Sequence, residues 1–120
     1  SMPSVGGPMD PDAGYGRSHF ILGDNFGTAC EGSIVDTVEA VLNRHEHRVV
    51  RNKPFAGGYT TRHYGHPSEG VHALQIEINR ALYMDEDRIT RLASIWKIQA
   101  QMTEVVFARN GTAQADLAAE

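Results

Sequence analysis

Hydrophobic residues recur at helical spacing in two parts of the chain. In residues 33–46 the apolar positions follow the i, i+4, i+7, i+8 pattern of one helix face: Ile34, Val35, Val38, Val41 and Leu42. Ser33 and Asp36 resemble a capping box, so we predict a helix here. A second series, spaced by three or four, predicts a long helix over residues 86–109: Ile89, Leu92, Trp96, Gln99, Met102 and Val106. We expect it to stop near Asn110-Gly111, with residues 111–120 as a frayed tail.

Four shorter segments have the composition of β-strands. Residues 19–23 form an apolar run that ends at a Gly-Asp pair, and residues 48–52 are closed by an Asn-Lys-Pro turn. Residues 59–64, YTTRHY, are rich in β-prone side chains and predict another strand. Residues 72–79 carry the clearest strand pattern of the chain. Residues 1–18 hold four Gly and three Pro without a hydrophobic period, which predicts an irregular loop.

The order of these segments predicts the fold class. Strand, helix and strand over residues 19–52 make a βαβ unit, whose right-handed crossover leaves the two strands parallel. We therefore expect an α/β fold, a mainly parallel sheet flanked by helices. At 120 residues the chain has room for one domain with a core of modest size.

Composition and charge exclude several classes of protein. A hydrophobic content of 41% and a charged content of 22% are ordinary for a soluble globular protein. Nothing approaches the roughly 20 consecutive apolar residues of a membrane span, so we expect no membrane contact. The net charge of −4, with scattered basic residues, lacks the footprint of a nucleic-acid-binding protein. A single cysteine and the lack of a signal peptide favour a cytoplasmic protein.

The predicted strand 72–79 has one apolar and one polar face. Leu74, Ile76 and Ile78 alternate with a polar row formed by Gln75, Glu77 and Asn79. This row either faces water on an exposed sheet surface or lines a site. A buried carboxylate at Glu77 would be suited to general acid or base catalysis.

Arginine and tyrosine side chains flank this strand. Arg62 follows Gly57-Gly58, and its guanidinium would suit a carboxylate ligand, although a salt bridge to Glu69 or Asp85 explains it equally well. Arg80 and Tyr83 follow the strand at what would be the carboxyl edge of the sheet, where open α/β sheets bind ligands. A structural Arg80 that caps the next helix is an equal alternative.

The six histidines and Cys30 give no sequence motif for a metal site or a nucleophile. His63, His66 and His72 lack the paired spacing of zinc-binding motifs, so surface or hydrogen-bonded histidines are the simpler interpretation. No base stands beside Cys30 in the sequence, which favours a buried, inert thiol. We expect no metal bound by this chain alone.

Three blocks of the sequence resemble the N-formylglutamate amidohydrolase family. They are HFILGDNFGTAC, RVVRNKPFAGG and PFAGGYTTRHYGHPSEGVHALQIEINRALYMDE, and the likeness runs from about Ser1 to Glu86. The resemblance implies a zinc-peptidase-like (phosphorylase/hydrolase-like) fold and a metal-dependent hydrolase that converts N-formyl-L-glutamate to formate and glutamate in histidine degradation. It also implies a divalent metal, zinc by preference, in the full-length family.

The resemblance further implies roles for individual residues. Glu77 resembles the catalytic carboxylate that activates water, Arg62 resembles a clamp for the substrate carboxylate, and Tyr64 and Arg80 are weaker candidates for the same pocket. The partner of the site would be a small molecule, an N-formyl amino acid. A non-catalytic module that binds carboxylate ligands on the same scaffold is the alternative function.

The chain departs from the family in length. Family members are more than twice as long, and the last of their metal ligands is a His in an Asp-Cys-His-Ser-Met-Pro-Ser-like segment. This chain begins at Ser1-Met2-Pro3-Ser4, and Ser1-Met2 is either native or left by expression. We therefore expect a carboxyl-terminal fragment that is inactive alone. An uncovered sheet edge or apolar face would favour self-association.

Overall fold

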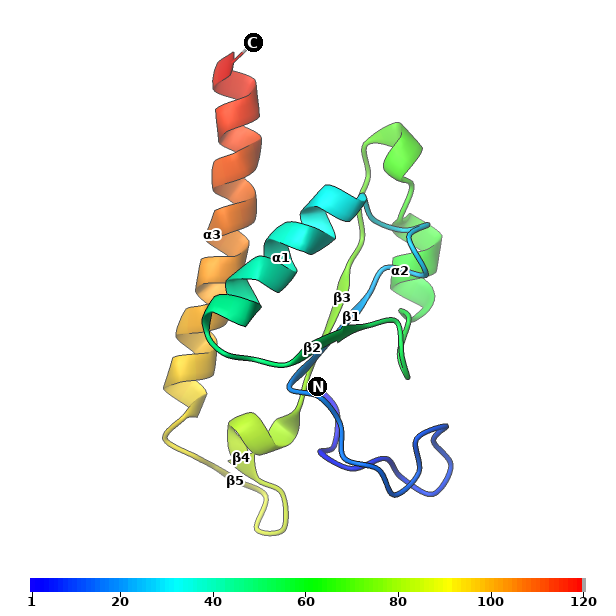
Figure 1. The fold of residues 1–120 in the computed structure, drawn as a ribbon, viewed down its shortest axis with the longest axis vertical. Helices are drawn as coiled ribbons and strands as arrows, with labels where there is room; N and C mark the ends of the chain where they lie inside the picture. Colours follow the sequence, from blue (N-terminus) through cyan, green and yellow to red (C-terminus); the bar gives the residue numbers. More distant parts are fainter. Residues whose placement is uncertain (120) are drawn as a thin grey trace.

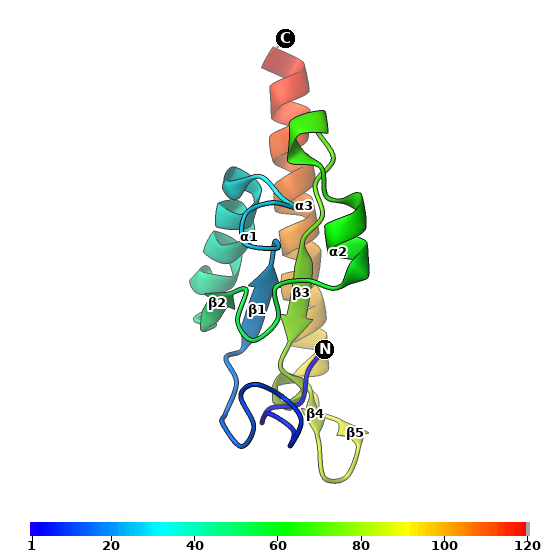
Figure 2. The same ribbon diagram turned by 90° about the vertical axis from the view of Figure 1, so that its right-hand side faces the viewer.

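A computed structural model describes the backbone of residues 1–119 and the side chains of residues 1–108. The elements are β1 (Phe20–Gly23), α1 (Gly32–Arg44), β2 (Val49–Arg51), α2 (Tyr59–Tyr64), the 3₁₀ turn η1 (Pro67–Glu69), β3 (Gln75–Ile78), the 3₁₀ turn η2 (Arg80–Leu82), β4 (Met84–Asp85), β5 (Thr90–Arg91) and α3 (Ile95–Ala119). Figures 1 and 2 show α1 and α3 on one face of the small sheet, while the segment from β2 into α2 passes over the opposite face. No helix in the described part of the chain is long and apolar enough to cross a membrane.

The main sheet has the strand order β2-β1-β3. β1 and β2 are parallel, with Phe20 beside Val49, as the predicted βαβ unit requires. β3 is antiparallel to β1, with Ile21 opposite Glu77. The α/β class is confirmed, whereas the prediction of a mainly parallel sheet is wrong for β3.

The antiparallel direction of β3 follows from the path of residues 52–74. This segment stays at the carboxyl end of β1: a Cβ on Gly23 would lie 2.7 Å from the Ala56 carbonyl carbon, and the Ala73 N–H donates to Ala29 O at 2.9 Å. With only the six residues of α2 and the short turn η1, it forms no crossover helix that returns along the sheet. β3 therefore enters the sheet from the end at which β1 leaves it.

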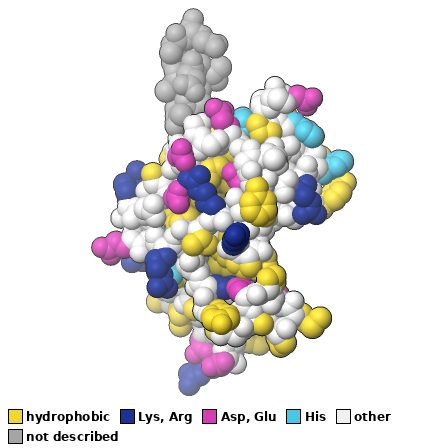
Figure 3. Space-filling model, turned by 45° about the vertical axis from the view of Figure 1, so that its right-hand side comes forward, with side chains coloured by type: hydrophobic (Ala, Val, Ile, Leu, Met, Phe, Trp, Pro, Cys, Tyr) yellow, Lys and Arg dark blue, Asp and Glu magenta, His cyan; other side chains and the backbone are white. Residues whose placement is uncertain are grey.

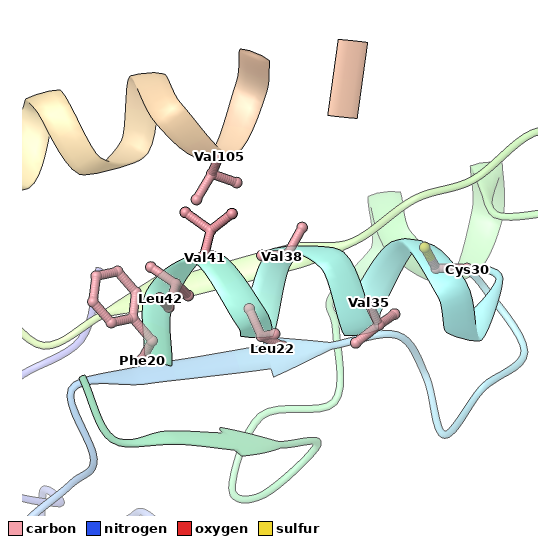
Figure 4. Close-up of a cluster of buried hydrophobic side chains, with 8 residues drawn as sticks. All are labelled: Phe20, Leu22, Cys30, Val35, Val38, Val41, Leu42 and Val105. Carbon is pink, nitrogen blue, oxygen red and sulfur yellow. The ribbon is translucent and has the colours of Figure 1, made fainter. Parts of the chain in front are cut away.

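The hydrophobic core lies between the sheet and the pair α1 and α3. Its buried residues are Phe20, Leu22, Cys30, Val35, Val38, Val41, Leu42 and Val105, shown together in Figure 4. Leu74, Ile76 and Ile78 pack against this cluster, which confirms the apolar face predicted for β3. The long helix thus covers the same face as α1, and the polar row points to the other side of the sheet.

The predicted helix 33–46 is confirmed as α1, but its capping box is wrong. The N-cap residue is Glu31, and no side chain bonds to the free amides of the first turn. Asp36 instead forms an ion pair of 2.8 Å with Arg51 of β2. Asp36 thereby ties the helix to the edge strand.

The strand predicted for YTTRHY is wrong, because these residues form helix α2. The glycines on both sides let the chain turn in and out of a short helix, and Thr61 packs directly on Gly57. Within the helix, the rings of Tyr59 and His63 stack with centroids 4.9 Å apart, as residues four apart on a helix do. Local packing therefore outweighs the β preference of Tyr and Thr.

The predicted carboxyl-terminal helix has both ends wrong. Residues 84–91 form the hairpin of β4 and β5, because the Asp85 side chain accepts hydrogen bonds from the backbone N–H groups of Asp87 and Arg88 and starts a turn. The helix begins only at Ile95. It continues past Gly111 to Ala119, where a stop and a frayed tail were expected.

The loop of residues 1–18 forms no regular element, as predicted, but it is organised around a buried arginine. Arg17 bonds to both carboxylate oxygens of Asp12 at 2.8 Å and to Asp10 at 2.7 Å, and its guanidinium lies over the Phe55 ring. These hydrogen bonds raise the pKa of Arg17. A charged side chain is thus the centre of a segment without a hydrophobic period.

Candidate active site around Glu77

Glu77 lies on the face of β3 opposite the hydrophobic core. Its side chain is 22% exposed, and its two carboxylate oxygens have different surroundings. Oε1 accepts a hydrogen bond from Gln75 Nε2 at 3.1 Å. Oε2 is buried and has no hydrogen bond among the described residues, although the Ser1 nitrogen lies 3.1 Å away as an ion pair. The distance to Ser1 is short, but the geometry is not that of a hydrogen bond.

Residues 1–4 run beside β3 and bring the Ser1 nitrogen to Glu77. The Met2 N–H donates to Ile78 O, and the Arg80 N–H donates to Met2 O, both at 2.9 Å. Met2 is 2% exposed, so its side chain anchors the segment. The Glu86 carboxylate accepts from the Ser4 N–H at 2.9 Å and from the Ser4 hydroxyl. This pairing with β3 therefore places the Ser1 nitrogen beside Glu77 Oε2.

Arg62 is exposed on α2 and forms no salt bridge among the described side chains. The predicted alternative, an ion pair with Glu69 or Asp85, is not present. Its Nη1 donates to the carbonyl oxygen of Gly57 at 2.9 Å. The rest of the guanidinium is open to a ligand. Arg62 does not touch Glu77 directly.

Tyr64 is also exposed, at 57%, and its ring meets the His63 ring edge to face at 4.7 Å. The Tyr59 ring stacks on the same His63 ring, so α2 presents two tyrosines in contact with one imidazole. Figure 3 shows histidine side chains gathered over α2 and η1, and a hollow below them toward the amino-terminal loop.

Arg80 and Tyr83 do not share an end of the sheet with Arg62. Because β3 is antiparallel, the residues that follow it lie at the far end from α2 (Figure 1). Arg80 starts the turn η2, and Tyr83 lines a groove of about 330 Å³ that is formed with α3 on the core side of β3. The expected position of both residues at a common carboxyl edge is therefore wrong.

Four histidines hold structural positions. His72 accepts the Glu31 N–H, His19 accepts the Arg48 N–H, His45 pairs with Glu104, and His47 pairs with Gln101. Burial lowers the pKa of His19. No three His, Cys, Asp or Glu side chains in the described part of the chain are grouped so that they could hold a metal ion. Cys30 is buried, as predicted.

Sequence reasoning missed the role of Gln75. It assigned Gln75 only to the polar row, yet Gln75 links Glu77 to α2, because its Oε1 accepts the Gly58 N–H at 2.8 Å. The third member of the row, Asn79, is buried and bonds to the carbonyl groups of Arg17 and Ser18, so its role is structural. The signal in the sequence was the Gly pair before Arg62, because glycine lets the backbone come close to another group.

Comparison with known proteins identifies related sequences and related solved structures. Residues 1–84 match the family model described as N-formylglutamate amidohydrolase. The chain is 44% identical over 68 residues to the N-formylglutamate deformylase of Pseudomonas aeruginosa, covering 56% of this chain and 26% of that protein. It is 34% identical over 90 residues to the N-formylglutamate deformylase of Pseudomonas putida, covering 72% of this chain and 32% of that protein.

One of the related structures is that of an N-formylglutamate amidohydrolase from Ralstonia eutropha JMP134. It superimposes with a TM-score of 0.77 and 32% identity, over 92% of this chain and 42% of that one. The chain thus spans about a quarter to a third of the length of the curated relatives.

Proposed function

Because the chain belongs to the N-formylglutamate amidohydrolase family, a family of hydrolases, we propose that the protein containing it hydrolyses N-formyl-L-glutamate to formate and L-glutamate. The observation that carries this proposal is the buried oxygen of Glu77. A buried carboxylate oxygen that accepts no hydrogen bond is uncommon in folded proteins, and catalysis is one of the few reasons to retain one. Oε2 is therefore the basic atom of the proposed reaction.

The proposed chemistry at Glu77 is proton transfer. Oε2 takes a proton from a water molecule as the water oxygen attacks the formyl carbon. The same carboxyl group then gives the proton to the amide nitrogen as the C–N bond breaks, which releases formate and the free amine of glutamate. Gln75 holds the other oxygen of Glu77 throughout.

Substrate binding is assigned to α2. A glutamate side chain or α-carboxylate would meet the open guanidinium of Arg62, whose planar fork matches a carboxylate. Tyr64 lies on the same short helix but two residues further on, where side chains do not share a face, so its part in substrate binding stays a prediction. Arg80 stays a prediction that no described contact supports, since its backbone is engaged with Met2 at the other end of β3.

The metal of the family resemblance is part of the proposal but not of the proton-transfer step. The described residues do not fit a metal ion by themselves, because they offer no group of three ligands. We propose that a divalent ion, zinc by preference, is held by other parts of the protein, in a zinc-peptidase-like fold and a cytoplasmic enzyme of histidine degradation.

The variant Glu77→Gln in the complete protein tests the function. It keeps the side-chain volume and removes the base, so turnover should fall by at least about 100-fold. The melting temperature should change little, since no arginine pairs with Glu77 among the described side chains. Formate release from N-formyl-L-glutamate, with zinc or another divalent ion supplied, is the assay.

Three results would contradict the proposal. Activity on N-acetylated amino acids or peptides alone would point to a different amide hydrolase. Binding of glutamate without turnover would favour the carboxylate-binding module. Unchanged turnover in Glu77→Gln would remove Glu77 from the reaction, even in an active enzyme.

A further inference from the structure

An unbroken chain of hydrogen bonds leads from Arg62 to Glu77. Arg62 Nη1 donates to the carbonyl oxygen of Gly57 at 2.9 Å. The N–H of the same peptide group, on Gly58, donates to Gln75 Oε1 at 2.8 Å. The amide nitrogen of the Gln75 side chain then donates to Glu77 Oε1 at 3.1 Å. Two amide groups therefore connect a guanidinium cation to a carboxylate.

Both amides point the same way along this chain. Each accepts a hydrogen bond at its oxygen and donates one from its nitrogen, so the positive charge of Arg62 and the negative charge of Glu77 polarise them in the same sense. Hydrogen bonds aligned in this way strengthen one another. The orientation of the Gln75 amide is also determined, because a flipped amide would set its NH₂ group against the Gly58 N–H and its oxygen against a carboxylate.

The backbone at Gly57 fits this arrangement and few others. Its φ is +122°, a conformation that side chains other than glycine rarely adopt, and a Cβ would lie 2.8 Å from Thr61 Cγ2. The peptide group between Gly57 and Gly58 is thus held with its oxygen toward Arg62 and its N–H toward Gln75. A rigid peptide in this position transmits a change at Arg62 to the Gln75 side chain.

From this geometry we infer that Gln75 is a positioning residue that holds Glu77 Oε1 and couples Glu77 to the carboxylate-binding arginine. The inference rests on the proposed function for its catalytic meaning. Gln75 keeps Oε1 occupied, so Oε2, which accepts no hydrogen bond from the described residues, is the oxygen assigned as the base. A substrate carboxylate at Arg62 competes for the guanidinium charge and weakens the first link of the chain, and thereby weakens the hydrogen bond that Gln75 donates to Glu77.

Gln75→Leu in the complete protein removes both hydrogen bonds of Gln75 and nearly preserves its size. Loss of a hydrogen bond to a charged group changes an equilibrium or rate constant by about 10- to 100-fold. We therefore expect kcat to fall by that factor, while KM, which depends on Arg62, changes less. The acidic limb of the pH–rate profile should move to higher pH, because the carboxylate loses a donor that favours its charged form. Gln75→Glu should move it further, since it places a second carboxylate beside Glu77.

Gln99→Leu is the matched control, the same substitution at an exposed position on α3, and should leave both kcat and the pH profile unchanged. A double substitution with Arg62→Ala should reduce kcat less than the product of the single effects. Full additivity, or a Gln75→Leu enzyme with an unchanged pH profile, would overturn the positioning role and leave the proposed function intact.

A measurement on the 120-residue chain separates this inference from the proposed function. Glu77→Gln should shift the backbone amide resonance of Gly58 in an NMR spectrum, and the shift should vanish when Gln75 is leucine. If Gly58 does not respond, the hydrogen-bond chain is refuted whatever the activity. If Gly58 responds but the complete protein does not hydrolyse N-formyl-L-glutamate, the catalytic meaning fails together with the proposed function.

Discussion

Truncation of Leu22 to alanine should remove a large share of the stability of the chain. Leu22 is fully buried in β1, the middle strand of the sheet, and its side chain points toward α1 in Figure 4. Leu→Ala substitutions in protein cores cost about 2.7–5.0 kcal/mol, and more where the surroundings cannot collapse. Strands on both sides of β1 and a helix above it prevent the surroundings from closing the cavity. We therefore expect Leu22→Ala to lower the free energy of unfolding by about 4 kcal/mol. Total stabilities of small domains are only about 5–15 kcal/mol.

Urea unfolding followed by circular dichroism measures this loss in the 120-residue chain. Val50→Ala is the control, because Val50 lies on the edge strand β2 and is 38% exposed. Val50→Ala should lower the free energy of unfolding by under about 1 kcal/mol, and its dependence on urea concentration should equal that of the unsubstituted chain. A cost below about 1.5 kcal/mol for Leu22→Ala, or equal costs for the two variants, would show that the core is not organised around β1.

Two further predictions concern single contacts. Gly65→Ala should destabilise the chain because its Cβ would lie 2.6 Å from the backbone of Ala29, whereas Gly32→Ala, with nothing within 4 Å, should not lower the melting temperature. Arg17→Met should flatten the acid dependence of stability. The hydrogen bond from Arg17 holds the pKa of Asp12 below the usual 3.8, so its stabilising effect is complete above that pH and is lost as pH falls through the lowered value. Urea titrations at pH 7 and pH 3 should show that the free energy of unfolding decreases less for Arg17→Met than for the unsubstituted chain. An equal decrease in both proteins would contradict this prediction.

The sequence predicts those elements whose hydrophobic pattern has only one explanation. The helix from Ser33 and the strands around Phe20 and Val49 have apolar residues that meet in one core, and the structure contains all three. The alternation in β3 is equally plain, because Leu74, Ile76 and Ile78 face that core. In each case the burial of apolar side chains decides both the local structure and its place in the fold.

The errors arise where polar groups decide the path of the chain. Ile89 and Leu92 fit a helical period, yet the Asp85 side chain turns the backbone before a helix can form, and Ile89 takes a positive φ of 53° in that turn. In the same way, the contacts of Gly65 and Gly57 fold YTTRHY into a helix. Hydrogen bonds and close backbone contacts of this kind leave no periodic trace in the sequence.

The candidate site combines both cases. Glu77 could be chosen from the sequence because a charge in the middle of an alternating strand stands out against its apolar neighbours. Its link to Arg62 could not, because it passes through a backbone peptide and depends on β3 running antiparallel to β1. In a parallel arrangement, Gln75 would lie at the opposite end of the sheet from Gly58, and the hydrogen-bond chain could not form. The direction of one strand therefore decides which of the two flanking arginines, Arg62 or Arg80, is coupled to the carboxylate.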